Sequence, residues 1–380
     1  MTGPTSYPHL DALADLNRDI SLRDKLQIAH QSVQANFPFI ARIAVALYDP
    51  ETHILKTYLH SSGDDNPLEN YETLLENAPS LKQILAVGRP RVINNMLTFE
   101  DGQHEHTRRL GRQGYAASYT MPVYQNGIFL GFVFFNSYQT DVFSEIVLSE
   151  IDLYGHLIAM MIINEITSIK TLSAALRTTS HLTHLRDPET GSHLDRMSRY
   201  SRLIAMQLAK THQLDDDYIE HLFMFAPLHD IGKIAIPDNI LLKPAPLSSE
   251  EREIMKTHAR LGREIIDNLL ANFMLEGIHH VDVLRNIAES HHEAMNGSGY
   301  PYGKKGNDIP LEARIVAVAD VFDALTSKRP YKEAWSNAEA FNTLKQLAGS
   351  QLDQECVSAL IDNQAAIEAI QNQFHEDIYG

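Results

Sequence analysis

The stretch that decides the C-terminal half is residues 222–233, LFMFAPLHDIGK. An apolar, helix-like run ends there in an adjacent histidine and aspartate, His229 and Asp230. A single histidine on an apolar helix is usually a packed or capping residue. A buried, unpaired carboxylate beside a histidine is unfavourable unless a cation neutralises it. The doublet therefore indicates a metal centre rather than ordinary packing.

Further donors lie before and after this doublet. Residues 188–193 read PETGSH, so Glu189 and His193 are four residues apart and share one face of a helix. The alternative for Glu189 is an acid in the first helical turn, where it interacts favourably with the helix dipole. The remaining candidates are His258, His291, His292 and Asp320. These donors make a metal centre the first hypothesis for the C-terminal half.

The composition limits the partners of the chain. The net charge of −17 disfavours polymeric nucleic acid, whose binding needs an extended basic face. Cys356 is the only cysteine, which excludes an intramolecular disulfide framework and a thiolate zinc cage and fits a reducing cytoplasm. The N-terminus lacks a basic region followed by an apolar run, and the most apolar stretch, residues 157–163, is too short to span a bilayer. We expect a cytoplasmic protein with no membrane contact.

Residues 1–150 have the pattern of an α/β domain with an antiparallel sheet. The turn Asn126-Gly127 between two apolar runs is a strong hairpin signal. An earlier pair of apolar runs is joined by the turn at residues 49–52. The expected strands are residues 43–48, 54–59, 118–124 and 128–136, and the expected helices are residues 21–35 and 144–165.

Residues 151–185 predict a long connecting helix. Its apolar residues recur at near-heptad spacing, which has two explanations. The helix packs on one domain, or it is a parallel two-helix connector in a homodimer. We favour the connector, because the apolar seam runs past both domain edges. The seam consists of Ile151, Tyr154, Ile158, Ile162, Ile169, Leu172 and Leu176.

Residues 186–380 predict an all-α domain. Pro227 removes a backbone donor and predicts a kink just before His229. The glycine-rich loop at residues 296–306 contains Gly299-Tyr300-Pro301, which we expect to shape the rim of a pocket. The expected helices are residues 192–211, 215–230, 248–270, 281–292, 311–326, 336–348 and 353–372.

The C-terminal half resembles the HD-GYP phosphodiesterases over residues 185–375. The family's HDIGK, later single His, HHE, GYP and final Asp are present in order, and so is its RPYK stretch at residues 329–332. The order of helices and hairpins in the first 165 residues is similar to that of a GAF domain, a sensory and dimerisation module. The resemblance implies a GAF-like domain, a connecting helix and an HD-GYP domain.

The HD-GYP resemblance also implies roles for individual residues. Asp230 and Lys233 are expected to be catalytic. Lys233, Arg329 and Lys332 match the positions that contact phosphate, and Gly299, Tyr300 and Pro301 form the substrate-side loop. The implied metal ligands are Glu189, His193, His229, Asp230, His258, His291, His292 and Asp320.

The implied ligand set bears on the metal. Five imidazoles with three carboxylates are too rich in nitrogen for magnesium or calcium, and no thiolate is present to favour structural zinc. Histidine–carboxylate sites with open positions suit iron or manganese. The resemblance to the HD-GYP family makes iron the first expectation and manganese the second. A glutamate at the position of Glu189 resembles the members that hold three ions, whereas many other members hold two.

The resemblance implies a phosphodiesterase that hydrolyses cyclic di-GMP to pGpG, with continuation to GMP left open. One alternative is preference for 3′,3′-cyclic GMP-AMP. A second is a catalytically weak cyclic di-GMP receptor, and a third is a general HD-type nucleotidase. GGDEF-domain proteins, which make cyclic di-GMP, are candidate partners. The ligand of the GAF-like domain is not legible in the sequence.

Overall fold

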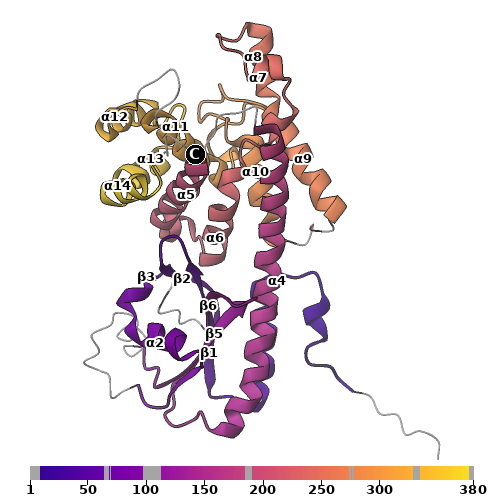
Figure 1. The fold of residues 1–380 in the computed structure, drawn as a ribbon, viewed down its shortest axis with the longest axis vertical. Helices are drawn as coiled ribbons and strands as arrows, with labels where there is room; N and C mark the ends of the chain where they lie inside the picture. The colour runs from indigo at the N-terminus through magenta and orange to yellow at the C-terminus, as the bar shows by residue number, and fades with distance from the viewer. Residues whose placement is uncertain are drawn as a thin grey trace, which may run out of the picture. The chain divides into compact units, whose positions relative to one another are not determined.

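The computed structural model describes residues 9–63, 68, 70–96, 113–184, 191–273, 275, 278–327 and 334–375. The chain divides into two compact units, Met1–Ile166 and Thr167–Gly380, which are considered separately (Figure 1). The boundary falls inside the long helix α4 (Glu145–His184).

The N-terminal unit is built on a six-stranded antiparallel sheet with strand order β3-β2-β1-β6-β5-β4. The hairpin between β5 and β6 turns at Asn126 and Gly127, whose φ angles of 51° and 81° are those of the expected tight turn. Both expected hairpins are present. The strands are β1 (Ile40–Asp49), β2 (Ile54–Ser62), β3 (Glu72–Leu74), β4 (Arg91–Ile93), β5 (Ala117–Gln125) and β6 (Ile128–Ser137).

Helices complete this unit. In α1 (Leu22–Asn36), Ser21 caps the first turn by accepting a hydrogen bond from the Asp24 amide, and the apolar face is buried in the sheet core. The short helix α2 (Pro79–Val87) and the three-residue strands β3 and β4 were not expected. Segments this short give almost no periodic signal. Single 3₁₀ turns occur at Ala14–Asn17 and Leu75–Asn77.

The apolar seam expected on α4 is used within the chain. Ile151, Ile158 and Ile162 are at most 2% exposed and belong to the core of the N-terminal unit. Ile169 and Leu172 are 1% exposed and belong to the core of the C-terminal unit. Interpreting these positions as a dimer seam is therefore wrong, because they already pack against their own units. The side chain of Leu176, the last seam position, lies outside the described residues.

The expectation that no segment is long enough to span a bilayer considered only residues 157–163, and a longer apolar segment is present. Within the described residues, Glu145–Leu172 of α4 is long and apolar enough to be a candidate membrane span by length and composition alone. Its apolar residues at the seam positions are buried in the cores of the two units, as in the core helix of a globular protein. One such helix is weak support for a membrane span.

The C-terminal unit consists, in its described part, of helices joined by loops, with one isolated β-bridge between Ala348 and Leu352. The expected helix at residues 215–230 ends at Phe225, and Pro227 lies in the 3₁₀ turn that follows. The expected helices at 248–270 and 353–372 are each two helices. The elements are α5 (Gly191–His212), α6 (Asp216–Phe225), η4 (Ala226–Leu228), η5 (Ile231–Ala235), α7 (Asp238–Leu241), α8 (Ser249–Lys256), α9 (His258–Phe273), α10 (Val281–Ser290), η6 (Gly306–Asp308), α11 (Leu311–Thr326), α12 (Asn337–Leu347), α13 (Gln354–Ile361) and α14 (Gln364–Gln373).

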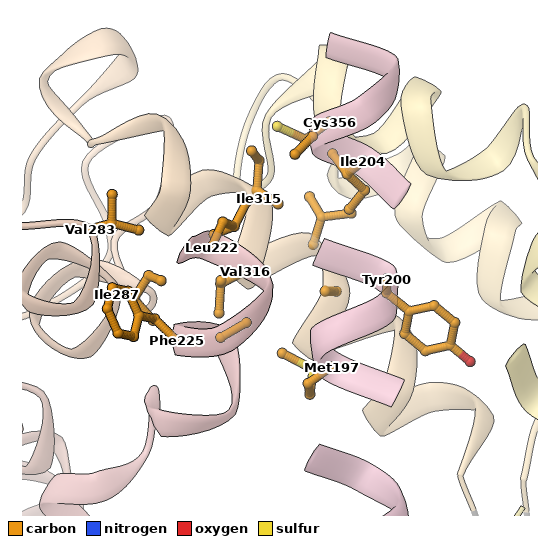
Figure 2. Close-up of a cluster of buried hydrophobic side chains, with 14 of the residues drawn as sticks. Met197, Tyr200, Ile204, Leu222, Phe225, Val283, Ile287, Ile315, Val316 and Cys356 are labelled. Carbon is orange, nitrogen blue, oxygen red and sulfur yellow. The ribbon is translucent and has the colours of Figure 1, made fainter. Parts of the chain in front are cut away.

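A single large apolar cluster holds these helices together. Leu222 and Phe225 of α6 lie in it with Val283 and Ile287 of α10, and Val316 of α11 lies beside them (Figure 2). These side chains bury the inner faces of helices that lead toward the histidine and aspartate motifs. The core therefore fixes the backbone from which the candidate ligands project.

Candidate metal centre

Seven of the eight expected metal ligands lie among the described residues, in two groups. In each group, one ligand atom per residue lies within 4.8 Å of those of the other members. Together we call the two groups the central cluster. The first group is Asp230, His258, His291 and His292, and the second is His193, His229 and Asp320.

The two groups are neighbours. His229 belongs to one group and Asp230, the next residue, to the other, and His229 Nε2 lies 3.4 Å from Asp230 Oδ2. The imidazole ring centroids of His229 and His291 are 5.2 Å apart. Because adjacent side chains diverge from one backbone, the doublet serves both groups. Asp230 thus lies next to a member of the other group and could contribute to either.

Gly232 explains how the His-Asp turn reaches α9. A Cβ atom at this position would lie 1.9 Å from the carbonyl oxygen of His258 and 2.5 Å from the Gly262 amide nitrogen. Only glycine permits this approach. The close packing brings Asp230 Oδ1 to 3.1 Å from His258 Nε2. Gly232 thereby couples the HDIGK turn to the single histidine that follows it in sequence.

Three histidines of the cluster are each oriented by the same type of hydrogen bond, from Nδ1 to a backbone carbonyl. Nδ1 of His229, His258 and His291 lies 2.9, 2.7 and 2.8 Å from the backbone carbonyl oxygens of Ala226, Met255 and Ile287, respectively. A carbonyl oxygen can only accept, so each Nδ1 carries the proton and donates it. In the neutral ring Nε2 is then an unprotonated acceptor. Such contacts commonly fix the tautomer of metal-ligating histidines.

The Nε2 atoms of these histidines lie close to a carboxylate oxygen, and this arrangement is electrostatically unfavourable unless a cation is present. Asp230 Oδ1 lies 3.1 Å from His258 Nε2 and 3.4 Å from His291 Nε2. Within the described part of the chain, these three buried atoms have no hydrogen-bond partner. Lone pairs of nitrogen and oxygen therefore face one another in a buried space, which is costly. A divalent cation satisfies all of them, so the residues present fit a metal ion.

The protonation states agree with a ligand role. Burial lowers the pKa of both His291 and His292, and the nearby His291 lowers the pKa of His292 further. Both rings are therefore neutral near pH 7. Burial alone raises the pKa of Asp230, but the Lys233 ammonium and His229 outweigh it and hold the pKa well below its ordinary value. Neutral imidazoles and an ionised carboxylate are the forms that bind metals.

Asp323 and Arg196 orient His193, and neither was singled out from the sequence. His193 Nδ1 lies 2.7 Å from Asp323 Oδ2, and Arg196 Nε donates to Asp323 Oδ1 at 2.5 Å. Burial raises the pKa of Asp323, but hydrogen bonds from His193 and Arg196 lower it to about 2. The available signal was helical spacing, because Asp323 follows Asp320 by three residues and Arg196 follows His193 by three.

The Gly-Tyr-Pro loop is attached to the His-His-Glu segment. A Cβ at Gly299 would lie 2.3 Å from the Ala294 amide nitrogen, so this glycine is required for close backbone packing. Glu293 accepts hydrogen bonds from the amides of Tyr302 and Lys304 at 2.8 and 3.0 Å. Both contacts hold the loop beside the residues that follow α10.

Tyr300 and Lys233 both lie next to residues of the central cluster. The Tyr300 ring centroid is 4.7 Å from that of His292 and 6.1 Å from that of His258. Burial, with the Asp230 charge, raises the pKa of Tyr300, so it stays a neutral phenol. Lys233 Nζ lies 2.8 Å from Asp230 Oδ2. The expected site residues Glu189, Arg329 and Lys332 lie outside the described residues.

Comparison with known proteins identifies the type of domain that the C-terminal region resembles. Residues 188–356 match the family model described as an HD domain. A protein of Xanthomonas campestris named "Cyclic di-GMP phosphodiesterase response regulator RpfG" is 47% identical over 189 residues, covering 50% of this chain and 47% of that protein. A Vibrio cholerae protein named "3'3'-cGAMP-specific phosphodiesterase 2" is 38% identical, covering 47% of this chain and 32% of that protein. The chain thus spans about half the length of the first of these relatives.

The N-terminal unit is similar to GAF domains of solved structures. One is the phycocyanobilin-bound GAF domain of a cyanobacterial phytochrome, with 15% identity, a TM-score of 0.32, and coverage of 40% of this chain and 89% of that one. The C-terminal region, by contrast, is an HD domain, and its curated relatives are named cyclic-dinucleotide phosphodiesterases.

Proposed function

We propose that this chain is a metal-dependent phosphodiesterase that hydrolyses cyclic di-GMP to pGpG. The observation that carries the proposal is the convergence of buried, unprotonated Nε2 atoms on the Asp230 carboxylate, which fits divalent cations. The relatives that share this HD domain and carry the name cyclic di-GMP phosphodiesterase support the choice of reaction. Hydrolysis onward to GMP stays open.

The two groups of the central cluster are the proposed holders of two ions, with Asp230 between them. Glu189 is the proposed additional ligand of a third ion. Iron is the first choice and manganese the second, because the set is rich in imidazole and lacks thiolate. When bound, paired divalent ions neutralise a phosphodiester and lower the pKa of water. Analysis of metal content should give about one ion fewer per chain in Glu189→Ala if that third position exists.

Residues of the chain supply the rest of the chemistry. Lys233, 2.8 Å from Asp230, places an ammonium group where a phosphate charge is neutralised or a leaving oxygen is protonated. Tyr300 offers a neutral ring and hydroxyl beside His292. Gly299 and Pro301 hold that loop in place. Arg329 and Lys332 are the proposed contacts to the second phosphate, with the arginine fork suited to bidentate binding.

A second candidate substrate is 3′,3′-cyclic GMP-AMP. It is favoured by the relatives whose names state specificity for that dinucleotide, at 38% and 36% identity. A catalytically weak cyclic di-GMP receptor is the remaining alternative. The ligand positions that lie among the described residues are all filled by metal-binding side chains, which supports activity over a degenerate site.

The proposed setting is a cytoplasmic homodimer regulated by its GAF-like domain, with GGDEF-domain proteins as candidate partners. Because the seam residues are buried within the chain, we place the dimer contact on another face of α4. Ile146, Leu153 and Met160 are 75%, 72% and 69% exposed and follow one another at intervals of seven residues. A heptad stripe of exposed apolar residues is the pattern that pairs two helices. Leu153→Glu should convert the dimer to a monomer in light scattering.

The decisive experiment combines metal analysis with turnover. Full-length protein purified without oxygen is assayed for bound iron and manganese, and its hydrolysis of cyclic di-GMP and cyclic GMP-AMP is followed by chromatography of the products. We expect metal in the preparation and faster turnover of cyclic di-GMP. Faster turnover of cyclic GMP-AMP would replace the substrate assignment. Bound metal with neither activity would favour the receptor.

A further inference from the structure

A second cluster of histidines and a carboxylate lies in the same unit, outside the central cluster. It contains Asp217, His279 and His280, and we call it the helix-start cluster. One ligand atom from each residue lies within 4.8 Å of the other two. Asp217 is in the first turn of α6, and His280 is the residue immediately before α10. None of the three residues belongs to the HD-GYP motifs.

The contacts within this cluster centre on a carboxylate that is withdrawn from solvent. The Asp217 side chain is 0% exposed. Its Oδ2 atom lies 2.7 Å from His279 Nδ1 and 3.4 Å from His280 Nε2. Asp217 Oδ1 and His280 Nε2 are buried atoms with no hydrogen-bond partner among the described residues. An unsatisfied, buried carboxylate oxygen beside an unsatisfied ring nitrogen is unfavourable without a cation.

The backbone at His280 supports the convergence of the two imidazoles. His280 has φ 54° and ψ 21°, a left-handed conformation that non-glycine residues adopt uncommonly. The two consecutive rings have centroids 3.9 Å apart, and both approach Asp217. Asp217 is supported from behind, because His221 Nδ1 lies 2.8 Å from the Asp217 carbonyl oxygen and 3.3 Å from Oδ1. The donors are therefore positioned before any ion arrives.

We propose that Asp217, His279 and His280 form a second metal site, separate from the central cluster, for a divalent first-row transition ion such as zinc. Two imidazoles and one carboxylate are a recurrent set for such ions, with a further position left for water. Magnesium and calcium are disfavoured, because they prefer oxygen ligands. The proposal does not depend on the phosphodiesterase assignment, since it rests on donors that the proposed reaction does not use.

The site lies where two packed helices begin, so an ion bound there would link those helices. α6 and α10 pack against each other, and both begin at the helix-start cluster. At their other ends, η4 leads from α6 to His229, and α10 leads directly to His291, whose ring centroid is 5.2 Å from that of His229. An ion at the helix starts would link two helices, each of about 15 Å, that deliver ligands to the central cluster. It acts as a positioning site and not as a catalytic one.

The competing explanation is an ion pair, in which protonated histidines neutralise Asp217 without metal. The test uses full-length protein loaded with zinc, freed of excess ion and analysed for zinc per chain. The variant is His280→Asn, because asparagine tolerates the left-handed backbone but does not replace the imidazole ligand. The matched control is His212→Asn, which removes a histidine of the same unit that pairs with Glu355 at 2.7 Å. A second variant, His279→Gln, avoids the left-handed position entirely.

We expect His280→Asn and His279→Gln each to bind about one zinc fewer per chain than the wild type, with His212→Asn unchanged. Zinc should also raise the melting temperature of the wild type more than that of either variant. Circular dichroism before loading establishes that the variants are folded. Equal zinc in all four proteins would overturn the site and leave the ion pair. Failure of the phosphodiesterase assay would not affect this outcome, because zinc content is measured without substrate.

Discussion

The two ends of the α6–α10 pair offer the most instructive comparison in this molecule. At the central cluster, three histidines use Nδ1 to donate to backbone carbonyls, and their Nε2 atoms face the ligand space. At the helix-start cluster, His279 instead directs Nδ1 at Asp217 itself, at 2.7 Å. These three histidines are thus oriented by backbone carbonyls, whereas His279 is oriented by a prospective ligand.

This difference predicts unequal dependence on metal. Without an ion, the central cluster leaves unprotonated nitrogens facing a carboxylate, and no change of tautomer helps without breaking a backbone hydrogen bond. The helix-start cluster differs, because the tautomer of His279 with the proton on Nδ1 donates a hydrogen bond to Asp217 Oδ2 at 2.7 Å without any ion. The central cluster should therefore bind metal more tightly, and the helix-start cluster should tolerate its loss. The predictions below test this contrast.

The largest effect is expected for Asp230→Asn. The change removes the carboxylate charge that faces His229, His258 and His291 but keeps the side-chain shape. We expect metal affinity at the central cluster and cyclic di-GMP turnover each to fall by more than about 100-fold. Mutation of residues that only hydrogen-bond to a metal ligand already lowers metal affinity or activity by about 10–100-fold. Metal analysis and product chromatography measure both quantities.

The same substitution at the other end provides the contrast. Asp217→Asn should remove the zinc of the helix-start cluster and leave turnover within a few-fold of wild type. If Asp230→Asn hydrolyses cyclic di-GMP normally while folded, the central cluster is not the active site. If Asp217→Asn abolishes turnover as completely as Asp230→Asn, the proposed division of roles between the two clusters is wrong.

The second effect in size concerns the residues that orient His193. Asp323→Asn removes the carboxylate charge that holds the His193 ring and pairs with the Arg196 guanidinium. We expect a 10–100-fold loss of metal affinity. Metal titration of the stripped protein measures it. Ser327→Ala, which removes a hydroxyl that donates to the same carboxylate at 3.1 Å, is the milder control. Wild-type affinity in Asp323→Asn would show that His193 does not need this orientation.

The sequence predicted the parts of the fold that carry long periodic signals. Both N-terminal hairpins and the helices at residues 192–211 and 311–326 were expected close to their actual bounds. The break at Thr257 was missed, because Ser248 and the following apolar pattern read as one helix across it. The seam of α4 was assigned to the wrong partner. Heptad spacing identifies an apolar face but cannot say whether that face packs within the chain or between chains.

The site shows a similar limit. Ligand types and their order were legible as motifs, and the structure brings His193, His229 and Asp320 into one group, as well as Asp230, His258, His291 and His292 into another. The orienting contacts were not legible, because Asp323 and Arg196 are ordinary helical residues in sequence. The helix-start cluster was invisible for the same reason. Asp217 and His279 are separated by 62 residues, and only tertiary packing brings them together.

The third effect separates substrate binding from metal binding. Arg329→Ala removes a guanidinium that matches the family's phosphate-contacting position, and neither cluster includes it. We expect KM for cyclic di-GMP to rise more than about tenfold, or 1.4 kcal/mol, with metal content unchanged. Arg329→Lys should recover only part of this, since lysine lacks the bidentate fork. Lys332→Ala should be milder. Unchanged kinetics in Arg329→Ala would show that the family's phosphate contact does not carry over to this chain.

The smallest effect is a difference in acid sensitivity between the two clusters, measured on metal-free protein. Burial lowers the pKa of His291 and His292 from the ordinary value of 6.5. Below pH 6.5 the unfolded chain takes up protons that the folded rings resist, so stability is present above that pH and is lost as the pH falls. Burial raises the pKa of Asp217, but the neighbouring His221, His279 and His280 outweigh it and hold that pKa below its ordinary value, so its contribution to stability is lost only on stronger acidification.

Urea unfolding from pH 8 to pH 3 resolves these two windows. Each histidine that stays neutral contributes a slope of up to about 1.4 kcal/mol per pH unit below its unfolded pKa. His292→Gln should flatten the decline between pH 6.5 and 5, because glutamine does not titrate. Asp217→Asn should leave that decline intact and flatten only the part below about pH 4. A wild-type curve that is flat from pH 7 to pH 5 would contradict the neutral state assigned to the central histidines. A change in the upper window caused by Asp217→Asn would mean that the two ends of the α6–α10 pair titrate as one unit.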